Sequence, residues 1–139
     1  MKKLNELYKK LIDDDVYFFH NSIPNNKSAV IELNSEYGIV VDYSKIDTFA
    51  DELSVLAHEY GHIKTGSTHR MYSPLELISR HEYRATRYAI TMLIPFAALK
   101  AALISGICEI WELAEHFEVT EDFIKSAIQT YTDMGVYPF

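Results

Sequence analysis

Two histidines separated by three residues, with a glutamate directly after the first, are the side chains in this sequence best suited to chemistry. They belong to the run His58-Glu59-Tyr60-Gly61-His62. On a helix, side chains four residues apart lie one turn above each other, so both imidazoles can bind one zinc ion. Glu59 lies about 100° further around the helix, where it can act as a general base without binding the metal. The run therefore predicts a zinc-dependent hydrolase, with His58 and His62 as ligands and Glu59 as the catalytic base.

The alternative is that both histidines are ordinary helix-surface residues and that Glu59 is a solvated charge. A chance match to this pattern is expected in roughly one chain of this length in a few hundred. Gly61 argues against that alternative, because a glycine inside a helix costs about 1 kcal/mol relative to alanine. The glycine is better explained if a second helix crosses closely at the metal.

A catalytic zinc usually has three protein ligands and an open fourth position, so a third ligand is needed. After Pro74, a second helical pattern places one set of residues on a common, mostly apolar face: Ile78, Glu82, Ala85, Ala89 and Met92. A carboxylate on such a face must be paired, hydrogen-bonded or bound to metal. Glu82 is therefore the predicted third ligand. The alternative for Glu82 is a salt bridge with Arg84 or Arg87, and the weaker candidates for the ligand are His81 and His69.

Two residues just after the zinc helix could stabilise the transition state. His69 and Tyr72 follow the motif closely enough to reach over the metal. Such groups act by directing hydrogen bonds at developing charge. Each could equally be an ordinary residue of a surface loop.

Several local patterns define the elements that must position these side chains. Leu and Tyr at helical spacing predict a helix over residues 4–12. The runs 29–33 and 37–41, separated by Asn34-Ser35-Glu36, predict a β-hairpin. Downstream, the expected elements are the zinc helix at about 48–64, a second motif helix at about 75–94, and a helical C-terminal unit at about 96–133.

These elements predict the fold class α+β. We expect one mostly helical domain over residues 1–139, with a small N-terminal β-hairpin or sheet packed on the zinc helix. A length of 139 residues suits a single core, and 48% hydrophobic with 24% charged residues is ordinary for a globular protein. Trp111 is expected in the core.

Charge and cysteine content narrow the function. A formal net charge of −7 argues against a protein that grips phosphate backbones, so no direct nucleic-acid partner is expected. Cys108 is the only cysteine, which excludes an internal disulfide and favours a cytoplasmic location. We expect Cys108 to be buried as a small hydrophobe.

The N-terminus lacks the apolar run of a signal peptide, and Pro95 and Lys100 argue against a membrane span over residues 88–108.

Residues 113–123 have the rhythm of a helix-turn-helix, with Thr120 as the cap of its second helix. DNA binding is one interpretation. However, the second helix opens with Glu121 and Asp122, which would repel phosphates. A packing unit, or a docking site for a substrate protein, is the favoured interpretation.

Two motifs resemble the ImmA/IrrE family of metallopeptidases, which is common in prophages and mobile elements. The run at residues 58–62 resembles the family's zinc helix. Residues 82–89, followed by Leu93-Ile94-Pro95, resemble its signature E-x-x-A-D/N-x-F/Y-A with a later L-M/L-P. The resemblance covers about residues 29–125 and implies that Glu82 is the third zinc ligand. Thr86 stands where the family often has Asp or Asn, which affects the hydrogen bond expected to support a ligand.

The resemblance implies a zinc metallo-endopeptidase that hydrolyses a bond in a specific intracellular protein, a helix-turn-helix repressor of a phage or mobile element. The zinc ion would polarise the scissile carbonyl, and Glu59 would move the proton of the attacking water to the leaving amine. The acidic segment 109–122 would dock a basic partner. The alternative is a catalytically silent, zinc-containing regulator that acts by protein binding, although an intact Glu59 favours the enzyme.

Overall fold

A computed structural model of the chain describes residues 1–68 and 75–138. The helices are α1 (Lys2–Asp13), the 3-10 helix η1 (Tyr43–Lys45), α2 (Phe49–Lys64), α3 (Leu75–Leu93), α4 (Phe96–Ile104), α5 (Ile110–Phe117) and α6 (Glu121–Asp133). The strands are β1 (Tyr17–His20), β2 (Ser28–Leu33) and β3 (Glu36–Val41). The fold class is α+β, as predicted.

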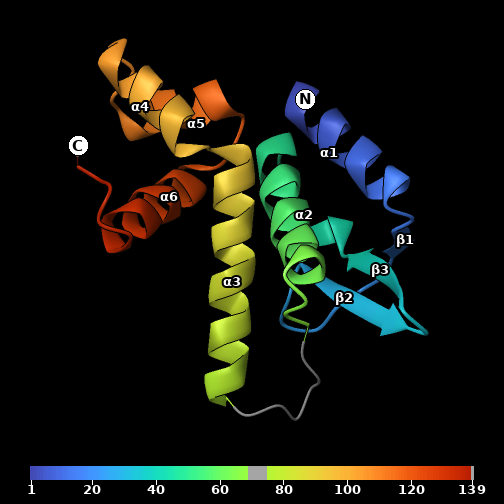
Figure 1. Ribbon diagram of the computed structural model, residues 1–139. Coiled ribbons are helices and arrows are strands. Elements are labelled where there is room, and N and C mark those ends of the chain that lie inside the picture. Colours follow the sequence, from blue (N-terminus) through green and yellow to red (C-terminus); the bar gives the residue numbers. More distant parts are fainter. Residues whose placement is uncertain (69–74, 139) are drawn as a thin grey trace.

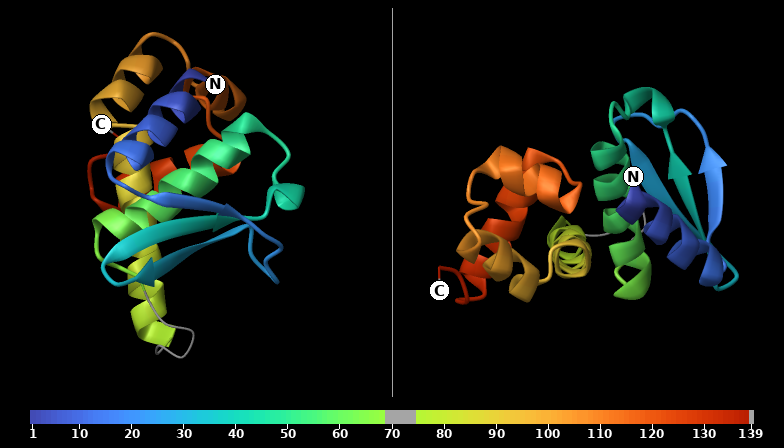
Figure 2. Two further views of the ribbon diagram at one scale, coloured as in Figure 1. Left: turned by 90° about the vertical axis from the view of Figure 1, so that its right-hand side faces the viewer. Right: turned by 90° about the horizontal axis from the view of Figure 1, so that it is seen from above.

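Helices α2 and α3 lie side by side at the centre of the molecule (Figure 1). The sheet and α1 flank α2, whereas α4, α5 and α6 gather beyond α3 (Figure 2). The buried hydrophobic side chains form one continuous core that runs from α1 to α6. The two central helices are therefore held from both sides, and their mutual position is set by the rest of the fold.

The three-stranded sheet has the order β1-β3-β2. Strands β2 and β3 form the predicted antiparallel hairpin, in which Ala29 pairs with Val40. Strand β1 was not predicted; it pairs in parallel with β3, placing Tyr17 beside Gly38. A four-residue strand shows too little alternation to be recognised locally, and its pairing depends on a partner about twenty residues away. Strand β2 is left at the edge of the sheet.

Helix α2 begins after Thr48, whose hydroxyl accepts the backbone N–H of Asp51 at 3.0 Å. This side-chain cap satisfies one of the free N–H groups of the first turn. The helix ends at Lys64, and Gly66 follows in the left-handed region with φ 63°. A buried stripe that includes Leu53 and Leu56 faces the core. The bounds agree with the prediction of about 48–64.

Helix α3 ends at Leu93, and Pro95 is the N-terminal cap of α4. The hydroxyl of Tyr131 on α6 donates a hydrogen bond of 2.6 Å to the carbonyl of Ile94. This bond closes the C-terminal helices onto the end of α3. Helix α5 starts at Ile110, and a capping box formed by Glu109 and Glu112 fixes its first turn.

Two expectations about burial were wrong. Cys108 is exposed in the turn before α5. Trp111 is 57% exposed, because the core-facing residues of α5 are Leu113, Ala114 and Phe117, and Trp111 lies beyond the edge of that face. Helical periodicity does not establish which of two adjacent faces meets the core.

Within residues 1–68 and 75–138, no single helix is long and apolar enough to cross a membrane. Only a pair of helical segments, Leu77–Leu93 with Phe96–Ile104, passes on combined length and composition, and the pair is bent by 52°.

Candidate metal centre

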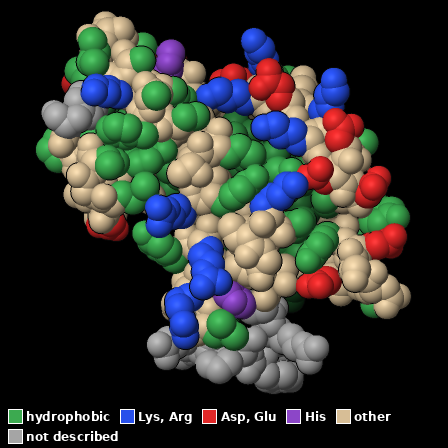
Figure 3. All heavy atoms as spheres, viewed as in Figure 1, with side chains coloured by type: hydrophobic (Ala, Val, Ile, Leu, Met, Phe, Trp, Pro, Cys, Tyr) green, Lys and Arg blue, Asp and Glu red, His purple; other side chains and the backbone are tan. Residues whose placement is uncertain are grey.

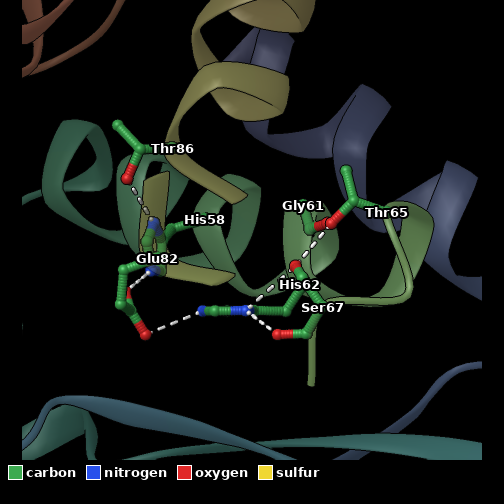
Figure 4. Close-up of polar contacts among 7 residues, drawn as sticks. All are labelled: His58, Gly61, His62, Thr65, Ser67, Glu82 and Thr86. Carbon is green, nitrogen blue, oxygen red and sulfur yellow. Dashed lines mark hydrogen bonds and ion pairs between the residues drawn. The ribbon is translucent and has the colours of Figure 1, made fainter. Parts of the chain in front are cut away.

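His58 and His62 lie one turn apart on α2, and Glu82 reaches them from α3 (Figure 4). The Nε2 atom of His58 is 2.7 Å from Oε2 of Glu82, and Nε2 of His62 is 3.1 Å from Oε1. The two imidazole planes are nearly perpendicular, at 88°, with centroids 4.8 Å apart. One possible ligand atom from each of the three residues lies within 4.8 Å of the others. The structure thus brings together the three side chains that the sequence singled out as ligands.

At Gly61 the backbone of α2 touches that of α3. A Cβ atom added at Gly61 would lie 2.3 Å from the carbonyl oxygen of Ala85 and 3.0 Å from its Cα. The first of these distances is shorter than real Cβ contacts, so the crossing requires the absence of a side chain at Gly61. This close approach is the reason that one helix can supply two histidines and the other a carboxylate to the same small volume.

The orientation of His62 follows from a hydrogen bond to the main chain. Its Nδ1 atom is 2.9 Å from the carbonyl oxygen of Ser67. A carbonyl can only accept, so Nδ1 carries the proton and donates it, and in the neutral ring Nε2 keeps the lone pair that a metal needs. Ser67 is fully buried, and its hydroxyl contacts that of Thr65, which donates to the carbonyl of Gly61 at 2.7 Å.

A hydrogen bond at Nδ1 also orients the ring of His58, but its partner is a side chain. Its Nδ1 lies 3.3 Å from the hydroxyl oxygen of Thr86, one turn beyond Glu82 on α3. With Nδ1 donating to that oxygen, Nε2 of His58 faces Glu82 and is the nitrogen that would bind a metal once its proton is lost. Thr86 therefore occupies the position from which an Asp or Asn would support the ligand, with a shorter and uncharged side chain.

The salt bridge with Arg84 or Arg87 that was the alternative role for Glu82 is not found among the described residues. Among the described residues, its ion pairs are with His58 and His62, while Arg84 and Arg87 are exposed. His81 is buried and is not a member of the potential metal-binding group found among the described residues. Glu82 itself is partly exposed, at 45% for its side chain, because it projects into an open pocket. His69 and Tyr72, the candidates for transition-state support, lie outside the described residues.

The electrostatics match a metal-binding group. Without a metal, protons on the Nε2 atoms of His58 and then His62 donate hydrogen bonds that hold the pKa of Glu82 far below its usual range. A bound cation would take the place of those protons. Burial alone would lower the pKa of His62, but its contacts with Glu82 and the Ser67 carbonyl outweigh burial and raise it. A carboxylate that stays charged between two imidazoles offers a metal cation one anionic and two neutral ligands.

Glu59 lies beside this group but is not part of it. The side chain is only 7% exposed, and burial raises the pKa of its carboxyl group. The nearby imidazoles and a hydrogen bond with the side chain of Ser28 oppose that shift and favour the charged form. A desolvated carboxylate with a raised pKa is a better proton acceptor than one in water, as a general base requires.

A pocket of about 340 Å³ opens over these residues. Its walls come from α2, α3 and the start of β2: Asn26, Lys27, Ser28, Ala29, Val30, His58, Glu59, His62, Thr68 and Glu82. The ammonium group of Lys27 pairs with Asp51 on α2 at 2.9 Å and so connects the start of β2 to that helix. The pocket therefore joins the predicted metal ligands to the edge of the sheet.

Two residues of the site escaped sequence reasoning. Ser67 and Ser28 sit in a loop and at a strand end, and neither belongs to a recognisable motif. The only local signal for Ser67 is its place directly after Gly66, where the chain turns back towards the helix that it has left.

The donor set fits a catalytic zinc ion. Two imidazole nitrogens and one carboxylate oxygen converge, both histidines have their second nitrogen engaged, and a carboxylate base lies next to them. A purely structural site closes all four positions with protein ligands, whereas this group leaves one side open to the pocket. The arrangement can therefore hold a metal and expose it to a substrate.

The family model for the IrrE N-terminal-like domain, Peptidase_M78, matches residues 13–129 of the chain. The match includes the hairpin, α2, α3 and most of the C-terminal helices. No curated protein and no solved structure matches the chain.

Proposed function

Because this chain belongs to the metallopeptidase family defined by the IrrE N-terminal-like domain, we propose that it is a zinc-dependent endopeptidase. The observation that carries the proposal is the convergence of His58, His62 and Glu82 in a pocket with Glu59 on its wall. The alternative of a silent regulator does not account for a buried carboxylate with a raised pKa at that place.

Zinc bound by the three ligands would supply Lewis-acid chemistry, polarising a peptide carbonyl and lowering the pKa of water. Glu59 accepts the proton of the attacking water and delivers it to the nitrogen of the leaving amine. The Ser67 carbonyl keeps a proton on Nδ1 of His62, so Nε2 is left to bind the metal, and the Thr86 hydroxyl can accept the same hydrogen bond from Nδ1 of His58. The burial of Glu59 keeps bulk water from competing for its proton.

The edge of β2 offers a place for an extended substrate. The carbonyl of Lys27 accepts the N–H of Asp42 at 2.8 Å, so Lys27 directs its backbone groups towards β3. Bonded and unbonded positions alternate along an antiparallel pair, and Ser28 and Val30 therefore direct theirs away from β3. Both residues line the pocket. We infer that a substrate strand pairs with them and brings its scissile bond to the metal ligands.

The substrate that we propose is one specific intracellular protein, a helix-turn-helix repressor encoded on the same mobile element. A pocket of about 340 Å³ holds few side chains and gives little sequence selectivity by itself. Selectivity must then come from a larger contact with a folded partner. The single cysteine and the net charge of −7 support a cytoplasmic enzyme that does not contact nucleic acid directly.

The decisive experiment compares Glu59→Gln with the wild type. The amide keeps the shape of the carboxylate but cannot accept the proton, so we expect unchanged zinc content and loss of cleavage. Glu36→Gln, an exposed change in the hairpin, is the matched control and should retain activity. Proteins from neighbouring genes are captured by pull-down, incubated with each variant and analysed by mass spectrometry. Cleavage by Glu59→Gln at the wild-type rate would remove Glu59 from the mechanism.

A further inference from the structure

A second groove lies at the opposite end of α2 from the metal ligands. It has a volume of about 420 Å³. The first turn of α2, helix α5 and the start of α6 form its walls: Thr48, Ala50, Trp111, Ala114, Glu115, Glu118, Val119, Thr120 and Glu121. Seen from above, α5 lies on the side of the molecule that faces away from the sheet (Figure 2). Nothing in the proposed hydrolysis uses these residues.

Trp111 gives the groove an apolar wall. Its side chain is 57% exposed, whereas Ala114 and Val119 beside it are buried. A large exposed aromatic next to small buried residues leaves a hollow of the kind that accepts an apolar side chain. Phe49, which is 58% exposed, lines an adjoining hollow that shares Ala50 with the groove. Two exposed aromatic rings thus flank one surface.

Every charged side chain that lines this hollow is acidic. The lining includes Glu115, Glu118 and Glu121 but no Lys, Arg or His. Glu118 is paired with the N-terminal amino group at 2.6 Å. Glu115 and Glu121 are exposed and make no ion pair within residues 1–68 and 75–138. Two uncompensated carboxylates beside an aromatic wall attract cations to the place where an apolar group can be buried.

Positive side chains gather elsewhere. On the face shown in Figure 3, Lys and Arg side chains lie along α3, and over α1 they are mixed with Asp and Glu side chains. The groove lining has acidic side chains and no Lys, Arg or His, so a basic partner is attracted to the groove.

We propose that this groove docks a basic segment of a partner protein, with one large apolar side chain against Trp111 and flanking Lys or Arg side chains on Glu115 and Glu121. The inference rests on the proposed function, since the partner would be the protein substrate. Ala50 precedes His58 by eight residues, or about 12 Å along a helix that rises 1.5 Å per residue. A segment held in the groove therefore leaves the metal pocket free for another part of the same partner.

The test uses Trp111, the only tryptophan in the chain, as a reporter within the groove. The probe is a synthetic amphipathic helical peptide of Lys and Leu, compared with a Gln and Leu peptide of the same pattern. Titrations are made with the full-length Glu59→Gln protein, so that hydrolysis plays no part. We expect the Lys peptide to shift the emission of Trp111 in a saturable way and to bind about tenfold more tightly than the Gln peptide. The affinity of the Lys peptide should fall as the salt concentration rises.

The double variant Glu115→Gln/Glu121→Gln should weaken binding of the Lys peptide about fivefold, the effect of losing two exposed ion pairs. The control is Asp13→Asn/Glu36→Gln, which removes the same charge from exposed positions outside the groove and should change affinity by less than about twofold. Equal weakening in both double variants would reduce the effect to net charge and overturn the proposal. Binding without any change in Trp111 emission would place the peptide outside the groove and would also overturn the proposal.

The peptide titrations can fail or succeed independently of the cleavage assay that tests the proposed peptidase activity. If the wild type cleaves no protein while the Lys peptide still binds at Trp111, the proposed hydrolysis fails and the docking groove stands. If cleavage is efficient and Glu115→Gln/Glu121→Gln cleaves the protein substrate as fast as the control, the groove has no part in substrate recruitment.

Discussion

Gly61 on α2 lies directly against the backbone of Ala85 on α3, with room for a hydrogen atom and nothing larger. The contact sits beside His62 and one turn from Glu82, so it sets the separation of the helices that carry the ligands. A property of the main chain therefore controls the geometry of the metal centre.

We predict that Gly61→Ala disrupts the site although alanine is the better helix former. Its Cβ would meet the Ala85 carbonyl oxygen at 2.3 Å, and the helices must separate. We expect a net loss of about 1–3 kcal/mol in the free energy of unfolding, typical of an overpacked contact, and a clear loss of zinc affinity. Chemical denaturation and competition with a chelating dye measure the two effects.

The control for this change is Gly106→Ala. Gly106 lies in the turn after α4 with φ 102° and nothing within 4 Å of an added Cβ, so the variant strains the backbone far from the ligands. It should lose stability and keep its zinc affinity. Equal zinc affinity in Gly61→Ala and the wild type would show that the close crossing is not needed for the site.

We predict about one zinc ion per chain, as expected for a single three-ligand site. His62→Ala and Glu82→Ala should each lose most of the metal, because two remaining ligands hold zinc weakly. Tyr83→Ala changes an exposed neighbour of Glu82 on α3 and should bind a full equivalent. Elemental analysis of the purified proteins decides the matter, and full zinc content in His62→Ala would exclude that residue as a ligand.

Thr86 should act through His58 rather than on substrate. Thr86→Val keeps the shape of the side chain but removes the oxygen that lies 3.3 Å from Nδ1. We expect a loss of about 10-fold in zinc affinity, the lower end of the effect of losing such supporting bonds. Thr86→Asn should retain affinity, since its amide oxygen can also accept from Nδ1.

The matched control is Thr91→Val on the same helix, where the hydroxyl donates to the carbonyl of Tyr88 and faces solvent. Competition with a chelating dye measures the zinc affinity of Thr86→Val, Thr86→Asn and Thr91→Val. A Thr86→Val affinity equal to that of Thr91→Val would mean that the Thr86 contact does not support the ligand.

Asp42 should make stability depend on pH. It accepts hydrogen bonds from the hydroxyl and N–H of Ser44 and from the N–H of Ile23, and these lower the pKa of its carboxyl group. A carboxylate whose pKa is lowered by folding adds stability above its ordinary value of 3.8, and this stability is lost as pH falls through the folded value. The wild type should therefore exceed Asp42→Asn in stability at pH 7 and lose that advantage below about pH 3.8.

Denaturant titrations of both proteins between pH 7 and pH 3 test this prediction. Asp13→Asn, at the exposed end of α1, is the control for a general change in charge. An Asp42→Asn difference that stays constant over the whole range would show that the ionised form of Asp42 is not what stabilises the loop before β2.

Local sequence rules were sufficient for the helices and for the principal metal-binding side chains. Caps, stop signals and apolar spacing act within a few residues, so α2 and α3 begin and end close to the positions expected. The spacing of His58 and His62 places both on one helix face whatever the rest of the fold does. Glu82 was recognisable because a carboxylate on an apolar face requires a partner, although only the structure showed that this partner is not Arg84 or Arg87.

Tertiary structure decided everything that depends on contacts between distant segments. Strand β1 exists only because β3 pairs with it, and the wall that β2 contributes to the pocket depends on which edge of the sheet is left open. The exposure of Trp111 follows from how α5 rotates onto the core. Periodicity defines a face but not the neighbour that will cover it. For this reason the sequence by itself determined which side chains could bind a metal, whereas only the fold decided their orientation by Ser67 and Thr86 and the shape of the surfaces around them.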